Sequence, residues 1–198
     1  MADSWRLFIA FELPEHILEL MQAVQADLQK VMPRSAMRWV RPEGIHLTLV
    51  FLGDVGPDRI PTLTKTMAEV AARHHPMSLG IEGLGVFPNL RRPSVLWLGV
   101  KGDLKPLAAA QDDLADELVP LGFKKETRPY RPHLTVARIK REASRADQEN
   151  VGKLVDRANL RVDGHWQVRA MSLMRSQFEP GGSIYTQVAE LPLAQSSD

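Results

Sequence analysis

Cysteine is absent from this 198-residue chain, which excludes disulfide bonds, thiolate metal sites and a cysteine nucleophile. Long apolar runs are also missing, because no segment approaches the roughly 18 consecutive apolar residues that a membrane helix requires. Neither sign of charge dominates, and the net charge of +1 gives no global positive field for gripping long duplex nucleic acid. The remaining composition, 44% hydrophobic and 25% charged, is that of an ordinary globular protein.

The length fits one domain, and we expect residues 1–198 to form a single domain of two lobes that share a core. The apolar stretch Leu7 to Leu13 contains Glu12, is followed by Pro14 and has no small-residue cleavage site. We therefore interpret it as a first strand and not as a signal peptide. A cytoplasmic monomer without membrane attachment is expected.

Strand and helix patterns alternate along the chain. The expected strands are 5–13, 37–40, 45–52, 77–86, 94–100, 130–139, 167–177 and 185–191. The expected helices are 14–30, 58–73, 104–118 and 144–158. The second half thus resembles the first, and no stretch has the composition of a long linker, so the two halves should pack together.

One tetrapeptide pattern occurs twice, 87 residues apart. The copies are His46-Leu47-Thr48-Leu49 and His133-Leu134-Thr135-Val136, near the strands expected at 45–52 and 131–138. Because side chains of a strand alternate between its faces, His and Thr share one face and the aliphatic residues share the other. Two copies on adjoining lobes can therefore direct two imidazoles at one cleft.

A structural explanation competes with this one. A single His in a strand is usually a partly buried, hydrogen-bonded residue, and a duplicated strand inherits similar residues. Core packing, however, requires only the aliphatic positions to match. The match of both His and Thr at the polar positions favours a functional role.

Paired imidazoles suit phosphodiester hydrolysis. Histidine titrates near pH ~6.5, so one ring can act as base while its partner acts as acid. Each proton transfer is typically worth ~10²–10⁴ in rate, and the Thr hydroxyls can donate hydrogen bonds to phosphate oxygens. This chemistry requires no metal and no cofactor.

The two motifs resemble the signature of the 2H phosphoesterase superfamily. Their flanks are similar to the RNA 2′,3′-cyclic phosphodiesterase family, also called 2′-5′ RNA ligases. The segments that carry this resemblance are Arg6 to Ala10, Arg38 to Glu43, His46 to Gly53, Arg131 to Arg138, and Leu173 to Leu191. The resemblance covers nearly the whole chain.

This resemblance implies an α+β, bilobal fold in which two pseudo-symmetric antiparallel-sheet lobes, with outer helices, surround a central groove. It implies hydrolysis of a terminal 2′,3′-cyclic phosphate on RNA to a 2′-phosphomonoester, with 2′-5′ ligation as an associated reverse reaction. By motif match, His46 is the proton donor and His133 the proton acceptor. The expected partners are RNA 3′ ends bearing the cyclic phosphate, including tRNA fragments or nucleotides.

Four further residues are candidates for binding the substrate phosphate: Thr48, Thr135, Arg138 and Arg131. Arg131 lies two positions before His133, on the same face of a straight strand. Arg138 lies five positions after it and nominally points away, although the resemblance places an active-site arginine there. We expect a strand end or a β-bulge to resolve this conflict.

Basic and aromatic residues suggest where RNA could lie. The segment from Lys124 to Arg145 contains eight basic and two acidic residues, which predicts a basic rim beside His133 or, alternatively, ordinary solvated loops. Phe51, Trp39 and Tyr185 are candidate base-stacking residues. For Phe51, core packing is the favoured interpretation.

Two rival functions remain open. A non-catalytic RNA-end binding module would keep the fold and the basic rim, but binding alone would tolerate Asn or Gln in place of both histidines. The same histidine pair could instead act on a small cyclic nucleotide or in ligation.

Overall fold

The computed structural model describes residues 4–180 and 182–195. The strands are β1 (Trp5–Glu12), β2 (Met37–Trp39), β3 (His46–Val55), β4 (Met77–Phe87), β5 (Val95–Gly102), β6 (His133–Ile139), β7 (His165–Val168), β8 (Ala170–Glu179) and β9 (Gly182–Pro192). The α-helices are α1 (Glu15–Val31), α2 (Ile60–Ala71), α3 (Leu104–Leu118) and α4 (Arg145–Arg157). Two 3₁₀ turns, η1 (Pro42–Gly44) and η2 (Pro57–Arg59), precede β3 and α2.

All described strands join one antiparallel, curled sheet, and its order explains the internal repeat. The order is β7-β4-β5-β6-β3-β1-β8-β9, and β2, which lies off this path, also pairs with β6. Read from the centre outward, β6-β5-β4 on one side mirrors β3-β1-β8 on the other. The two motif strands, β3 and β6, are therefore the central neighbours. We call the two sides the β5 lobe and the β1 lobe.

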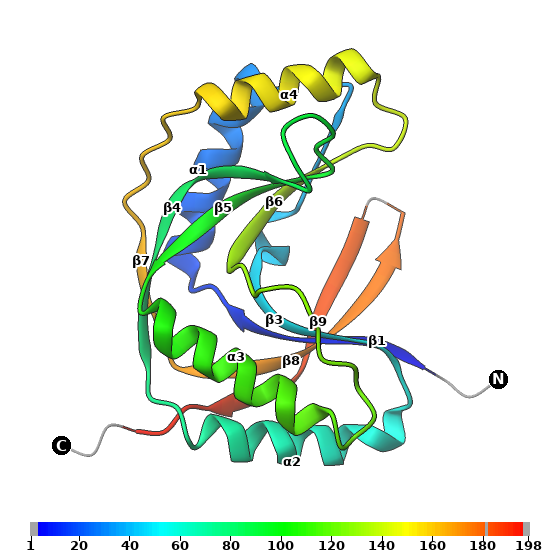
Figure 1. The fold of residues 1–198 in the computed structure, drawn as a ribbon, viewed down its shortest axis with the longest axis vertical. Coiled ribbons are helices and arrows are strands. Elements are labelled where there is room, and N and C mark those ends of the chain that lie inside the picture. Colours follow the sequence, from blue (N-terminus) through cyan, green and yellow to red (C-terminus); the bar gives the residue numbers. More distant parts are fainter. Residues whose placement is uncertain (1–3, 181, 196–198) are drawn as a thin grey trace.

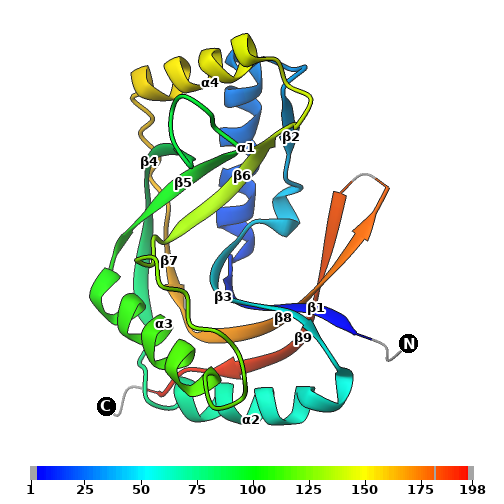
Figure 2. The ribbon, with the colours of Figure 1, turned by 45° about the vertical axis from the view of Figure 1, so that its right-hand side comes forward.

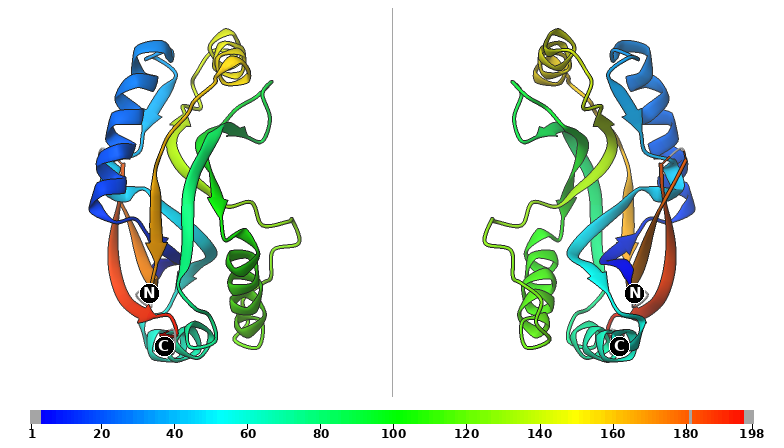
Figure 3. Two further views of the ribbon diagram at one scale, coloured as in Figure 1. Left: turned by 90° about the vertical axis from the view of Figure 1, so that its left-hand side faces the viewer. Right: turned by 90° about the vertical axis from the view of Figure 1, so that its right-hand side faces the viewer.

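Helices cover one face of each lobe. Helices α1 and α4 lie at one end of the molecule and α2 and α3 at the other (Figures 1 and 3). Helix α1, which follows β1, crosses to the β5 lobe and reaches the backbone of Val136 in β6. Helix α3, which follows β5, crosses to the β1 lobe and packs on β3. This exchange ties the lobes together. The predicted α+β fold of antiparallel strands with outer helices is confirmed.

The core follows strand alternation. Leu7, Ile9 and Phe11 of β1 are buried in the main core on the helix side, whereas Phe8 and Ala10 form a small second cluster on the opposite face. The opposite, concave face therefore carries its own apolar support. This support lies beneath the place where the motif side chains emerge.

One predicted strand is wrong. The run 167–177 is divided at Arg169 between β7, which pairs with β4, and β8, which pairs with β1. These two strands lie toward opposite ends of the sheet. The chain thus crosses from the β5 lobe to the β1 lobe within a few residues of Arg169.

Candidate active site

The two motifs meet at the centre of the sheet. In the described part of the chain, β3 and β6 pair through one residue each, Leu47 opposite Leu134. Both leucines are completely buried on the helix side. Their neighbours His46, Thr48, His133 and Thr135 consequently point to the concave face. Because residues 47 and 134 are equivalent in the repeat, the pseudo-twofold axis passes between them.

A β-bulge lies at the last residue of each motif, the same place in the repeat. The pairing of β1 with β3 passes over Leu49, and the pairing of β5 with β6 passes over Val136. An extra residue reverses the alternation of the strand beyond it. In β6 the bulge brings Arg138, opposite Val95, to the face that Thr135 and His133 occupy.

The corresponding bulge in β3 brings Phe51 to the concave face of the β1 lobe. Phe51 is the repeat equivalent of Arg138, so the pseudo-symmetry is broken at this pair. The favoured interpretation of Phe51 as a core residue is wrong, because its side chain is 75% exposed. Its ring lies 6.2 Å from that of Phe8, which itself stacks on His46 at 4.6 Å.

A side-chain donor reaches the backbone at or beside each bulge. In β6, the amide of buried Gln25, from α1, donates to the carbonyls of Val136 and Val40 at 2.8 and 2.7 Å. In β3, the Tyr130 hydroxyl donates to the carbonyl of Thr48 at 3.0 Å. These bonds satisfy carbonyls where the ladder is irregular, and so hold the bulge geometry.

Both imidazoles are oriented in the same way. His46 Nδ1 lies 2.8 Å from the Gly44 carbonyl oxygen, and His133 Nδ1 lies 2.7 Å from that of Arg131. A carbonyl can only accept, so each Nδ1 carries the proton in these bonds. Each Nε2 is thereby left as the atom that can exchange a proton with a substrate.

Aromatic rings enclose each imidazole. His46 lies between Phe8, stacked at 4.6 Å, and Tyr185, edge-on at 5.0 Å. His133 contacts Phe87 edge-on at 4.9 Å, with Trp97 at 6.2 Å. The rings restrict rotation of the imidazoles and partly exclude water from them.

Burial lowers the pKa of His46 from 6.5 to about 4, against the raising effects of the Gly44 carbonyl and Glu12; the charges of His133 and Arg138 add to the lowering. Burial also lowers the pKa of His133, again with a contribution from Arg138. The two imidazoles and the Arg138 guanidinium therefore act on one another's charge. Without a bound anion, His46 is neutral at neutral pH.

Arg131 differs from the other sequence candidates. It precedes β6, its side chain is exposed, and its backbone carbonyl orients His133. The repeat equivalent of Arg131 is Gly44, whose carbonyl performs the same task for His46. The orienting role therefore needs no side chain at this position.

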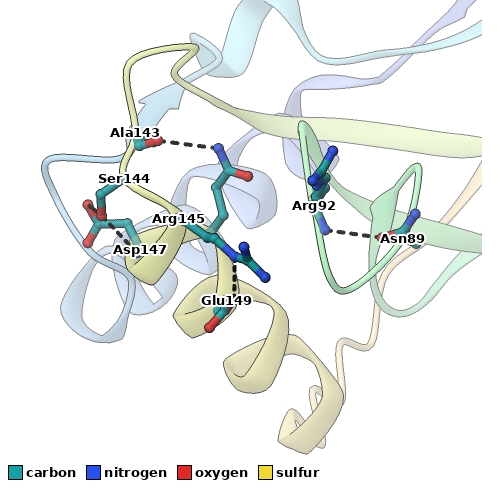
Figure 4. Close-up of polar contacts among 8 residues, drawn as sticks. Asn89, Arg92, Ala143, Ser144, Arg145, Asp147 and Glu149 are labelled. Carbon is teal, nitrogen blue, oxygen red and sulfur yellow. Dashed lines mark hydrogen bonds and ion pairs between the residues drawn. The ribbon is translucent and has the colours of Figure 1, made fainter.

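The expected basic rim is partly neutralised. Lys125 pairs with Asp112 and Asp116, and Arg128 pairs with Glu126. Figure 4 shows Arg145 paired with Glu149 in the first turns of α4. Ser144 caps this helix by accepting from the Asp147 backbone N–H at 3.0 Å (Figure 4). These basic residues serve local structure.

Within residues 4–180 and 182–195, no group of three or more His, Cys, Asp or Glu side chains is placed to hold a metal ion. No helix in the same part of the chain is long and apolar enough to cross a membrane.

Comparison with known proteins places this arrangement in a family. Residues 13–178 match the model of the 2′-5′ RNA ligase superfamily. A Methanothermobacter thermautotrophicus protein named RNA 2′,3′-cyclic phosphodiesterase is 36% identical over 91% of this chain and 95% of its own length. A protein of the same name from Aquifex aeolicus is 31% identical over 95% of this chain and 97% of its own length.

Solved structures agree with the sequence comparisons. A Thermus thermophilus protein superimposes with a TM-score of 0.78 at 27% identity, covering 97% of this chain and 100% of that one. E. coli LigT complexed with 3′-AMP gives a TM-score of 0.73 at 27% identity, covering 98% and 100%. A curled antiparallel sheet with two histidine motifs at its centre defines a 2H phosphoesterase fold. This chain belongs to the 2′-5′ RNA ligase superfamily.

Proposed function

We propose that this protein is a cyclic phosphodiesterase that hydrolyses a terminal 2′,3′-cyclic phosphate on RNA to a 2′-phosphomonoester. The observation that carries the proposal is the pair of imidazoles on one concave face, each with Nδ1 bound to a carbonyl and Nε2 left for the substrate. Relatives named RNA 2′,3′-cyclic phosphodiesterase support the same activity. The complex of E. coli LigT with 3′-AMP supports a nucleotide as ligand of this fold.

The proposed reaction needs one base and one acid. His133 Nε2 accepts a proton from water, and the resulting nucleophile attacks phosphorus. The bond between phosphorus and the 3′ oxygen breaks, and His46 Nε2 donates a proton to that oxygen. The phosphate stays on the 2′ oxygen. Proton exchange with solvent then returns His133 to its neutral form and His46 to its protonated form.

Three side chains are proposed to stabilise the charge that grows on the phosphate. Thr48 and Thr135 donate hydrogen bonds from the motif strands, and Arg138 supplies a positive charge on the same face. The exposed Arg131 side chain adds positive charge for RNA phosphates, while its carbonyl orients His133.

The lowered pKa of His46 constrains this assignment. A proton donor must be protonated, yet burial holds the pKa of His46 at about 4 in the free protein. An anionic phosphate between the imidazoles raises the pKa of both, because an opposite charge favours the protonated form. Glu12, whose charge already raises the pKa of His46, favours protonation of this ring. The acid is therefore proposed to form with substrate bound.

Removal of either histidine tests the proposal. His46→Ala and His133→Ala should each lower kcat on an oligonucleotide with a 2′,3′-cyclic phosphate end by roughly 10²-fold or more. Unchanged turnover in both variants would exclude the two-histidine mechanism. We also propose that activity survives EDTA; loss that a divalent ion restores would point to a metal-dependent reaction instead.

The cellular form is part of the proposal. We infer one folding unit of two lobes, acting as a cytoplasmic monomer on RNA ends, including those of tRNA fragments and nucleotides. The helix exchange between lobes supports a single unit, since α1 bonds to β6. Light scattering and a single cooperative unfolding transition would agree with this, and two separate transitions would not.

A further inference from the structure

A small hollow adjoins the catalytic face. It lies between the segment from β2 to η1 and the hairpin of β8 and β9, which rises beside that segment in Figure 2. Its lining includes Arg38, Arg41, Arg138, Phe178 and Tyr185. We call this site the arginine hollow.

The charges of the arginine hollow are unbalanced. Arg38 of β2 lies directly opposite Arg138 of β6, and Arg41 follows two residues after β2. None of the described residues lining the hollow is acidic, and none of the three guanidinium groups has a hydrogen bond or ion pair to the rest of the described chain. Like charges directly opposite each other across strands destabilise a sheet. An anion bound between them would remove this repulsion.

The hollow is continuous with the proposed reaction centre. Arg138 lines the hollow and also lowers the pKa of both motif histidines through its charge. Tyr185 lines the hollow and contacts the His46 ring at 5.0 Å. The hollow and the proposed reaction centre therefore share Arg138 and Tyr185. This adjacency suits the next phosphate of the same strand.

The size and rim of the hollow fit a phosphodiester. Its space of about 50 Å³ accommodates a group of a few heavy atoms. Guanidinium groups match phosphate oxygens through paired N–H donors. At the rim, the Phe178 side chain is 80% exposed and offers a free aromatic face. Bases of single strands stack on such faces with little sequence preference.

We propose that the arginine hollow binds the phosphodiester that precedes the 3′-terminal nucleotide, while Phe178 stacks on the preceding base. This inference rests on the proposed function and specifies its substrate class. The protein acts on the ends of RNA chains in preference to nucleoside 2′,3′-cyclic phosphates. Arg38 and Arg41 determine that preference without contacting the reacting phosphate.

Three substrates with the same terminal nucleoside test the hollow. They are the nucleoside 2′,3′-cyclic phosphate, a dinucleotide ending in it, and that dinucleotide with an uncharged methylphosphonate linkage. The wild type should show a kcat/KM on the charged dinucleotide at least about tenfold above that on the mononucleotide. The combined Arg38→Ala and Arg41→Ala variant should lose the part of this advantage that the charged linkage provides, about tenfold, and keep its mononucleotide rate. The wild type and the double variant should have the same kcat/KM on the methylphosphonate dinucleotide.

Arg34→Ala is the matched control, because Arg34 is an exposed arginine four residues before Arg38 and outside the hollow. It should change none of the three rates. The proposal is overturned if kcat/KM of the double variant falls equally on the mononucleotide and the charged dinucleotide, or falls on neither. Phe178→Ala should lower the dinucleotide kcat/KM by about tenfold and spare the mononucleotide.

A binding measurement separates this proposal from the proposed function. Fluorescence anisotropy with a labelled, 3′-phosphorylated oligonucleotide needs no turnover. The double arginine variant should bind at least about tenfold more weakly than the wild type and Arg34→Ala. Equal affinities would overturn the proposed role of the hollow even if the enzyme is active. Weakened binding of the double variant, together with no hydrolysis of the cyclic phosphate substrates by the wild type, would support the role of the hollow and refute the proposed activity.

Discussion

Replacement of Gln25 by Met tests how the bulge in β6 places Arg138. The Gln25 amide donates two hydrogen bonds, to the carbonyls of Val136 and Val40. Methionine has a similar length and no donor. A net contribution of about 1 kcal/mol per bond gives a loss of about 2 kcal/mol in the free energy of unfolding. For a chain of this size, that corresponds to a fall in Tm of about 4–8 °C.

Activity should fall together with stability. The carbonyl of Val136 also accepts the Val40 N–H at 3.0 Å, so the bulge loses only part of its bonding. We expect the bulge to persist with greater freedom and Arg138 to be misaligned, with kcat/KM on a cyclic phosphate reduced by about tenfold. Outright removal of a charge-stabilising donor typically costs about 10²–10³, so Arg138→Ala should be the more damaging change.

Gln29→Met is the control, since Gln29 is exposed on the same helix. Its unfolding free energy should change by no more than about 0.5 kcal/mol. Denaturant unfolding and steady-state kinetics measure both effects. If Gln25→Met proves as stable as Gln29→Met, or loses stability while keeping full activity, then Gln25 does not hold Arg138 in place.

Three further predictions concern the rings around the site. Gly44→Ala should lower kcat by about tenfold, because a Cβ there would lie 3.1 Å from the Tyr185 ring that contacts His46; unchanged kcat would contradict this. Phe51→Ala should leave Tm unchanged, because the side chain is exposed, and raise KM for a nucleoside 2′,3′-cyclic phosphate; a marked drop in Tm would show a core role. Since burial lowers the folded-state pKa of His46 from 6.5 to about 4, the unfolded chain binds more protons between these values, and stability should fall as pH drops from 6.5 to 4. His46→Asn should reduce that fall in urea titrations, and an identical pH dependence would argue against the assigned cause.

The faces occupied by the motif side chains could be predicted from the sequence, because they depend only on residues that are close together in the chain. Period-two alternation assigns His46 and Thr48 to one face and Leu47 to the other, and the structure agrees. The helix 104–118 has clear apolar periodicity and is found at Leu104–Leu118. Such features depend on residues near in the chain.

The remaining features depend on distant partners. The bulge at Val136 arises where β5, β6 and Gln25 of α1 meet, so sequence spacing alone left Arg138 on the wrong face of a regular strand. The site of the turn at Arg169 has neither Gly nor Pro beside it. Only the pairing of β7 and β8 with different strands divides that run.

The exposure of Phe51 likewise depends on the pairing of β3 with a distant strand. A phenylalanine between valine and leucine in a strand favours a core position, but the bulge at Leu49 turns it outward. The signal that could have identified it was the repeat itself. Aligning the two motifs places Phe51 against Arg138, a position with an expected role at the site.

Product analysis by ³¹P NMR tests the proposed two-histidine hydrolysis. An oligonucleotide ending in a 2′,3′-cyclic phosphate is incubated with the wild type in the presence of EDTA, beside His46→Ala and His133→Ala. We predict a single 2′-phosphomonoester from the wild type and unreacted cyclic phosphate from both variants. A 3′-phosphomonoester, or the same product from the variants at the wild-type rate, would rule out the proposed reaction.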